Sequence, residues 1–276
     1  MITAKSGLIS KLIIYLILII VGITMIVPFA WMALTAFMTM SESMQVNPFV
    51  IIPAEWRLEN FQHVIETQNF MRLYYVTVMM ILGRVIAAVL TATLAGYAFA
   101  RINFIGKKLF FGIVLVQMMV PVQIFIIPQF QMVQRMGQLN TMFSLLFPGL
   151  VTAFGTFLLR QSYMSLPKEL EEASILDGCN IGQTFLFVMA PLVKSSMVAL
   201  SIFTAIFAYR ELMWPLIAQR DVMPLSGALA LMQGHDFTHF PQLMAAALLA
   251  CIPMLVIYLI FQKHFVEGIA TSGGKL

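Results

Sequence analysis

The residues best suited to chemistry lie in one hydrophilic stretch, residues 160–191. Glu169, Glu171 and Glu172 begin an expected helix there, where the helix dipole stabilises negative charge. Gly178 is the residue type that most often ends a helix in the left-handed conformation. The stretch therefore predicts a helix with an acidic and apolar surface that ends in a glycine elbow. Taken alone, such a segment could equally be an ordinary solvated acidic loop.

Signals on either side of the elbow complete a helix–elbow–helix unit. Pro167 suits the first turn of the first helix. Asn180 and Gln183 have the spacing of a capping box, which predicts that a second short helix begins after the elbow and runs to Pro191.

Motifs for catalysis are missing from the sequence. A phosphate-binding loop needs G-x-x-x-x-G-K-[ST], but the Gly-Lys pairs at 106–107 and 274–275 lack both the earlier glycine and the following Ser or Thr. Ser165 and Lys168 have S-x-x-K spacing, which we interpret as the start of a helix rather than a catalytic pair. We expect no enzymatic activity in this chain itself.

A metal site is also not expected. His235 and His239 are four residues apart beside Asp236, but two imidazoles rarely form a site alone, and an external loop is the favoured interpretation. Cys179 and Cys251 are interpreted as free thiols in or near the cytoplasmic half, where a disulfide is not expected.

Charged residues also fall inside apolar stretches, where they are costly and therefore suggest function. Arg84 lies 17 residues before Arg101, about 25 Å along a helix, which places it in the outer half of a bilayer. We hypothesise that Arg84, Arg210 and Glu211 line a passage and favour an anionic substrate, with replacement of Arg84 by Leu abolishing transport but not assembly. The favoured alternative is a structural Arg–Glu pair or an arginine that reaches the outer interface. Tyr209 and Trp214 flank the pair and are included in the candidate pathway.

The elements that must hold these residues are membrane helices. Of the 276 residues, 61% are hydrophobic and only 10% are charged, against about 25% charged in soluble domains. Six stretches are long and apolar enough to cross a bilayer as helices. We expect one all-α membrane domain with spans at residues 12–37, 73–100, 109–133, 142–159, 192–217 and 243–262. Pro28, Pro121, Pro128, Pro148 and Pro253 should kink several of them.

The distribution of basic residues sets the expected orientation. With both termini in the cytoplasm, ten of the 16 Lys and Arg lie inside and five outside, as the positive-inside rule requires. Arg84 lies within a span. This orientation makes residues 160–191 a cytoplasmic loop.

The loop resembles the EAA loop of ABC importer permeases. The pattern of that loop is read in Glu172-Ala173-Ser174, Gly178 and Pro191. Further matches to the carbohydrate-uptake branch are the segments at 98–101, 106–108, 139–141, 167–171 and 265–268. The resemblance covers nearly the whole chain and is strongest to the second permease of maltose-type and glycerol-phosphate-type importers. Two departures are Ser174, where alanine is usual, and the charged pair Arg210-Glu211 in place of a polar Trp-Asn pair.

The resemblance implies both roles and partners. Glu171, Glu172, Ala173, Asp177 and Gly178 would couple the chain to an ATPase subunit. The chain would pair with a homologous second permease, two ATPase subunits that use ATP and Mg, and an extracytoplasmic substrate-binding protein. It would lie in the cell (inner) membrane, bind no cofactor or nucleic acid itself, and move a sugar, oligosaccharide or polyol by alternating access. The alternative class, an ion-coupled secondary transporter or a channel, predicts an acidic residue near the midplane of a span, and none is found there.

Overall fold

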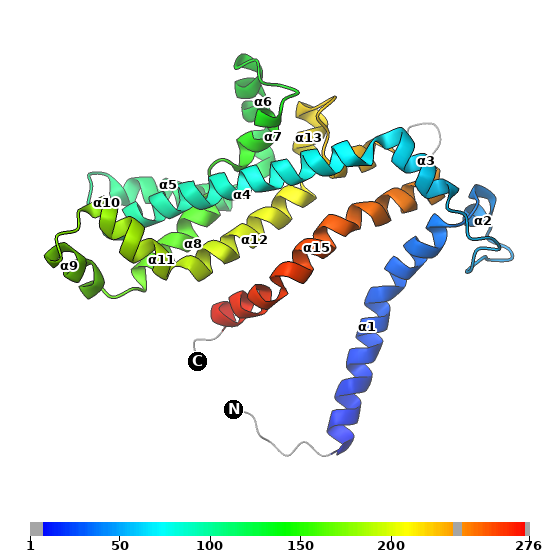
Figure 1. The fold of residues 1–276 in the computed structure, drawn as a ribbon, viewed down its shortest axis with the longest axis horizontal. Coiled ribbons are helices and arrows are strands. Elements are labelled where there is room, and N and C mark those ends of the chain that lie inside the picture. Colours follow the sequence, from blue (N-terminus) through cyan, green and yellow to red (C-terminus); the bar gives the residue numbers. More distant parts are fainter. Residues whose placement is uncertain (1–7, 234–238, 274–276) are drawn as a thin grey trace. The chain divides into compact units, whose positions relative to one another are not determined.

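The computed structural model describes residues 8–233 and 239–273. Within these residues the chain is helical and has no β-strand, only an isolated bridge between Val46 and Phe49. The expected all-α class is confirmed (Figure 1). Of the sequence features discussed above, His235, Asp236 and the side chains of residues 265–268 lie outside the described residues.

The helices vary from long and apolar to single turns. In chain order they are α1 (Leu8–Ala36), α2 (Met40–Met44), α3 (Glu59–Gln68), α4 (Phe70–Arg101), α5 (Lys107–Met119), the 3₁₀ turn η1 (Val122–Phe125), α6 (Ile126–Arg135), α7 (Met142–Leu146), the 3₁₀ turn η2 (Phe147–Gly149), α8 (Ala153–Met164), α9 (Glu169–Leu176), α10 (Ile181–Gln183), the π-helical turn η3 (Thr184–Met189), α11 (Ala190–Leu192), α12 (Lys194–Arg210), α13 (Met213–Ala218), α14 (Leu225–Leu231) and α15 (Phe240–Gly273).

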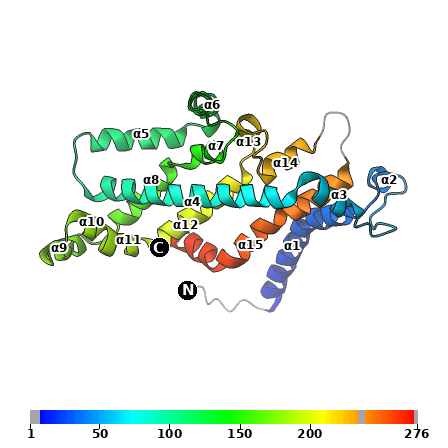
Figure 2. The ribbon, with the colours of Figure 1, turned by 45° about the horizontal axis from the view of Figure 1, so that its top comes forward.

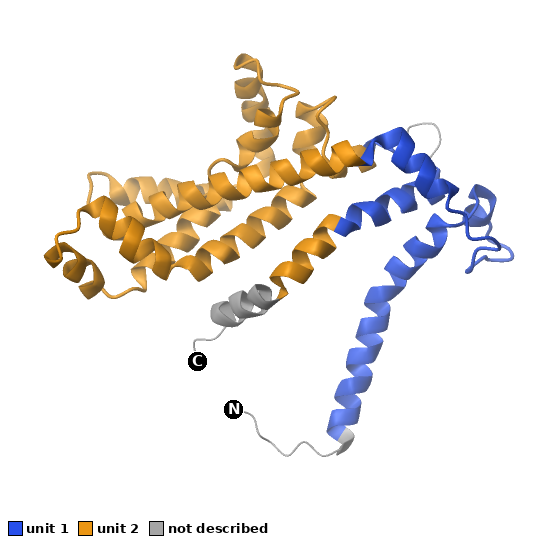
Figure 3. Ribbon diagram, in the orientation of Figure 1, with its two compact units in different colours: residues 1–70, 231–252 blue, residues 71–230, 253–276 orange. Residues whose placement is uncertain are grey.

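The chain forms two compact units (Figure 3). One contains residues 1–70 and 231–252, and the other contains residues 71–230 and 253–276. In the first unit, the Asn60 side chain donates to the carbonyls of Ala36 (2.9 Å) and Met38 (3.0 Å), which fixes the end of α1. Glu42 closes a capping box with Thr39. The backbone N–H groups of Thr39 and Ala54 donate to the Glu42 carboxylate and lower its pKa. All the candidate site residues lie in the second unit.

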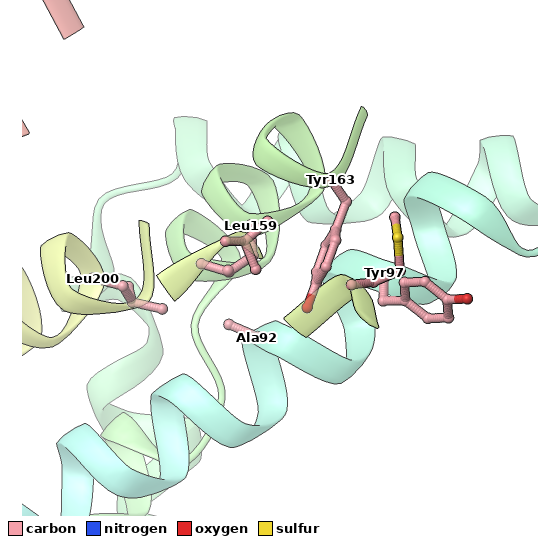
Figure 4. Packing of buried hydrophobic residues seen from close by; sticks show 7 residues of the cluster. Ala92, Tyr97, Leu159, Tyr163 and Leu200 are labelled. Carbon is pink, nitrogen blue, oxygen red and sulfur yellow. The ribbon is translucent and has the colours of Figure 1, made fainter. Parts of the chain in front are cut away.

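The core of the second unit lies where α4, α8 and α12 run side by side (Figures 1 and 2). Ala92 and Tyr97 of α4 pack there against Leu159 and Tyr163 of α8 and Leu200 of α12 (Figure 4). The Tyr97 and Tyr163 rings meet edge to face, with centroids 5.4 Å apart. This packing holds together the end of the unit that carries residues 160–191.

Among the residues that the structure describes, three helices are long and apolar enough to cross a bilayer unbroken: Ser10–Ala36, Phe70–Arg101 and Phe240–Gln262. Three bent pairs bring the number to six if each pair is one span. The bends are 105° between Lys107–Met119 and Val122–Arg135, 47° between Met142–Gly149 and Ala153–Met164, and 73° between Ile181–Leu192 and Lys194–Arg210. The expected number of six spans is compatible with this arrangement.

The expected boundaries of three spans differ from the observed helices. The stretch 109–133 is not a single kinked helix, because α5 ends at Met119 and the chain turns at Pro121, which has no N–H to continue the helix. The stretch 192–217 contains α12, which ends at Arg210, and the separate α13. The stretch 142–159 is divided between α7 with its turn η2 and α8, which begins at Ala153 and ends at Met164. Hydrophobicity located all three stretches but did not reveal these breaks.

Candidate functional site

The elbow of residues 169–183 has the expected local structure. α9 ends in a Schellman motif: Gly178 adopts φ +86°, the Cys179 N–H donates to the Ser174 carbonyl, and the Gly178 N–H donates to the Ile175 carbonyl, both at 3.0 Å. Space around a Cβ at Gly178 is open, so the demand for glycine there is purely conformational. The one difference is that the first helix begins at Glu169, two residues after Pro167.

The second half of the elbow is joined to the first by side chains. Asn180 and Gln183 form the expected capping box, with both bonds at 2.9 Å. The hydroxyl groups of Ser174 and Thr184 lie 2.8 Å apart, and both residues are buried. Ser174, which departs from the usual alanine, therefore gains a hydrogen bond that fixes the two helices against each other.

The two sides of α9 differ. Glu172, Ala173, Asp177 and Gly178 are exposed. The apolar side chains of Ile175 (60%), Leu176 (87%) and Ile181 (64%) are also exposed, and we call these three residues the elbow tip. Exposed apolar side chains gathered beside acidic ones are typical of a docking surface.

Glu171 points the other way, toward its own chain. Its carboxylate lies 3.7 Å from the Arg101 guanidinium at the end of α4, and its side chain is 18% exposed. Arg101 also donates to the carbonyls of Tyr163 (2.6 Å) and Leu166 (2.5 Å), at the end of α8. The structure thus separates Glu171 from the other four predicted coupling residues.

Arg84 is buried in the middle of α4, with 5% exposure. Its guanidinium forms an ion pair with Glu211, and its Nε–H donates to the Leu145 carbonyl at 2.7 Å. The alternative interpretation of a structural Arg–Glu pair therefore describes the geometry of this chain. Because removal of Arg84 would also leave Glu211 and the Leu145 carbonyl without this partner, we expect Arg84→Leu to lower stability as well as transport.

Two helix breaks at proline lie beside this pair. Pro148 cannot donate to the carbonyl four residues earlier, Ser144, and that carbonyl accepts the Trp214 indole N–H at 2.7 Å instead. Pro215 likewise frees the Glu211 carbonyl, which accepts the Ser226 hydroxyl at 2.6 Å. Side chains from other segments satisfy the broken backbone, as a lipid environment requires.

Gly149 permits the close approach of Arg84. A Cβ at this position would lie 2.7 Å from both Cγ and Cδ of Arg84. We expect Gly149→Ala to displace the arginine and to destabilise the protein by about 1–3 kcal/mol, measured as a lower thermal midpoint in detergent. Gly112→Ala is the control, since nothing lies within 4 Å of its Cβ position. Equal midpoints for the two variants would contradict the close packing.

The other candidate pathway residues are not gathered in one cluster. Trp214 is buried, with 1% exposure, and Tyr209 packs partly buried against Ile81, Ala205 and Ala208. Arg210 is exposed at the end of α12 and has no ion pair within the described residues. The grouping of Arg84, Arg210 and Glu211 thus becomes a buried pair and a separate exposed cation.

Sequence reasoning missed a polar hub at Asn140. Its side-chain oxygen accepts the N–H groups of Arg220 (3.0 Å), Asp221 (2.8 Å) and Val222 (3.4 Å), and its amide donates to Asp221 at 2.5 Å. Asn140 adopts φ +59°, which asparagine tolerates better than most residues. The asparagine before a threonine cap was the available signal, but its partners lie some 80 residues away.

The described residues contain no group of three or more His, Cys, Asp or Glu that could hold a metal ion. Cys179 and Cys251 are free thiols.

Comparison with known proteins identifies the family. Residues 85–271, which include the elbow and both helix breaks, match the family described as binding-protein-dependent transport system inner membrane component. The chain belongs to this family. It is a membrane permease subunit of a binding-protein-dependent importer.

Relatives of the permease match along almost their whole length. It is 28% identical over 252 residues to the arabinooligosaccharides transport system permease protein AraQ of Halalkalibacterium halodurans, which covers 90% of each chain. It is 28% identical over 267 residues to the sn-glycerol-3-phosphate transport system permease protein UgpE of Shigella flexneri, which covers 92% of this chain and 94% of the relative. A solved bacterial ABC transporter for import of the acidic polysaccharide alginate contains a chain of the same fold, with TM-score 0.80, 20% identity, and coverage of 96% of this chain and 99% of that one.

Proposed function

We propose that this permease imports a carbohydrate or a related polyol by ATP-driven alternating access, with the elbow as its contact to an ATPase subunit. The exposed elbow tip carries this proposal. Leu176 is 87% exposed on a helix that the positive-inside rule places in the cytoplasm, outside the lipid. Exposure of such side chains to water is unfavourable, whereas a protein cleft would bury them. The Ser174–Thr184 bond and the Schellman motif keep the tip rigid enough to transmit movement.

The proposed assembly follows from what this chain lacks. The sequence has no phosphate-binding loop, so two ATPase subunits that use ATP and Mg supply the energy. A homologous second permease forms the passage together with this chain, and an extracytoplasmic binding protein delivers the substrate. Both termini lie in the cytoplasm of a cell whose inner membrane holds the complex.

The names of the relatives support the substrate class. The relatives are named for arabinooligosaccharides, for sn-glycerol-3-phosphate and for the acidic polysaccharide alginate. Carbohydrates and polyol phosphates form this class. The exposed Arg210, close to the break after α12, is the residue of this unit that we propose to favour a substrate with an anionic group.

An ion-coupled transporter remains the second candidate to test. Its coupling site would need a carboxylate that gains and loses an ion at membrane depth. Glu211 is the nearest candidate, but it is held in an ion pair with Arg84. Transport across the membrane of sealed proteoliposomes should therefore require ATP in the compartment that the elbow faces. Uptake driven by an ion gradient alone would favour the second candidate.

Gly178→Ala tests the elbow directly. Because φ is +86° at this position, alanine is strained by about 1–2 kcal/mol, and the strain acts on the angle between the two helices of the elbow. We expect ATP-driven transport to fall several-fold in proteoliposomes. Gly137→Ala is a matched control, since Gly137 also has a positive φ (+66°) and open space, but lies in a turn outside the elbow. If both variants transport at the same rate, the elbow does not couple the ATPase to the gate.

A further inference from the structure

Arg101 and Glu171 join the docking helix to the rest of the second unit. We propose that Arg101 is a positioning residue, and that its contact with Glu171 transmits movement of α9 to α4 and α8. The inference rests on the proposed function of the elbow and assigns Glu171 a role different from that of its neighbours. Glu172, Ala173 and Asp177 are exposed and available for docking. Glu171 instead contacts Arg101 and joins α9 to its own chain.

The inner side of α9 carries the contacts. Glu171 and Ser174 are three residues apart, so they lie on one side of the helix. Glu171 meets Arg101 at the end of α4, and Ser174 meets Thr184 at the start of η3. α9 is thus held at two points on the side opposite the exposed Leu176. Movement of α9 is therefore transmitted both to α4 and to η3, because a helix that is held at two points cannot rotate freely.

Arg101 is placed to bind three groups at once. Its side chain is 7% exposed, and one amino group donates to the carbonyls of Tyr163 and Leu166 while the other faces Glu171. These carbonyls lie at the end of α8 and just beyond it, where helical partners run out. The planar guanidinium can hold two carbonyls and a carboxylate together, which a lysine ammonium cannot do in the same geometry. One residue therefore connects α4, α8 and α9.

α4 extends this connection through the unit. It is continuous from Phe70 to Arg101, with no proline inside, unlike α1 and α15. Arg84 lies 17 residues before Arg101, about 25 Å along the helix, and binds Glu211 and the Leu145 carbonyl at the helix breaks. In Figure 1, α4 runs from the end of the unit that holds α9 and α10 toward the end that holds α13. Two arginines on one rigid helix thus link the elbow to the positions where the bundle can bend.

The test compares Glu171→Gln with Glu169→Gln in the complete complex, purified with its native partner subunits and reconstituted in proteoliposomes. Glu169 is an exposed carboxylate in the same first turn, so its replacement controls for lost charge and for the helix dipole. For Glu171→Gln we expect normal co-purification of the ATPase and nearly normal ATP hydrolysis. Substrate moved per ATP should fall several-fold, because the amide keeps the size of the side chain but loses the ion pair with Arg101. Glu169→Gln should resemble wild type in both measurements.

A double-mutant cycle with Arg101→Gln adds a second readout. If the two residues act as one tether, the double variant should lose no more transport per ATP than Arg101→Gln alone. Loss of ATPase co-purification in Glu171→Gln would show that Glu171 docks rather than tethers. Equal falls in ATPase activity and transport, or wild-type behaviour, would also overturn the proposal. Failure of wild-type transport to require ATP would instead reject the proposed function, so the two failures are distinguishable.

Discussion

Replacement of Glu211 by alanine should lower the stability of the permease by about 3 kcal/mol, because it leaves the Arg84 guanidinium buried without its carboxylate. Loss of one partner of a buried pair costs about 3–5 kcal/mol, and the 25% exposure of the Glu211 side chain favours the low end. The measurement is the thermal midpoint of the purified complex in detergent. A second effect is a freer hinge after α12, since Glu211 lies at the break between α12 and α13.

Two variants control this prediction. Arg210→Ala removes the neighbouring charge, which is exposed and has no ion pair within the described residues, and should change the midpoint little. The double variant Arg84→Leu with Glu211→Leu should be more stable than the sum of its single variants predicts, because neither charge remains buried alone. If the losses of stability of the two single variants simply add up in the double variant, the buried ion pair is contradicted.

Trp214→Ala should destabilise the protein by about 3–5 kcal/mol without a specific loss of substrate affinity. The indole is 1% exposed, packs with Val133 and Ala218, and satisfies the Ser144 carbonyl that Pro148 leaves without a helical partner. Trp214→Phe keeps most of the packing and loses the hydrogen bond, so a smaller cost of about 1–3 kcal/mol is expected.

Trp56→Ala is the matched control for this variant, because Trp56 is 62% exposed and its removal leaves no buried cavity. The thermal midpoint and the substrate concentration for half-maximal transport should be measured together on the reconstituted complexes. A large rise in that concentration with an unchanged midpoint would return Trp214 to the substrate pathway, as the sequence hypothesis had it.

The elbow was predictable because its determinants are local. A left-handed glycine and an Asn–Gln capping box depend on residues within a few positions of each other. The sequence of residues 169–183 therefore indicated α9, the turn at Gly178 and the start of α10, and the structure confirms all three. What the local pattern could not indicate is that Glu171 points inward while Glu172 is exposed.

The membrane helices were predictable in kind but not in their breaks. Hydrophobicity indicates that a stretch prefers lipid, and it is insensitive to where the backbone bends inside that stretch. Proline indicated that a helical hydrogen bond is lost at Pro148, but the replacement donor, Trp214, comes from another segment. The end of α5 at Met119 was missed for the same reason.

The sequence by itself determined the all-α membrane class, the elbow and the family resemblance, since composition, capping and motif spacing act over short distances along the chain. Only the tertiary structure decided that Arg84 pairs with Glu211, 127 residues away, that Asn140 holds the loop after α13, and that Arg101 reaches α9. A buried charge or a freed carbonyl must find a partner, and the sequence shows which residues have this requirement. Which partner meets it depends on how the helices pack, because distant segments become neighbours only in the folded chain.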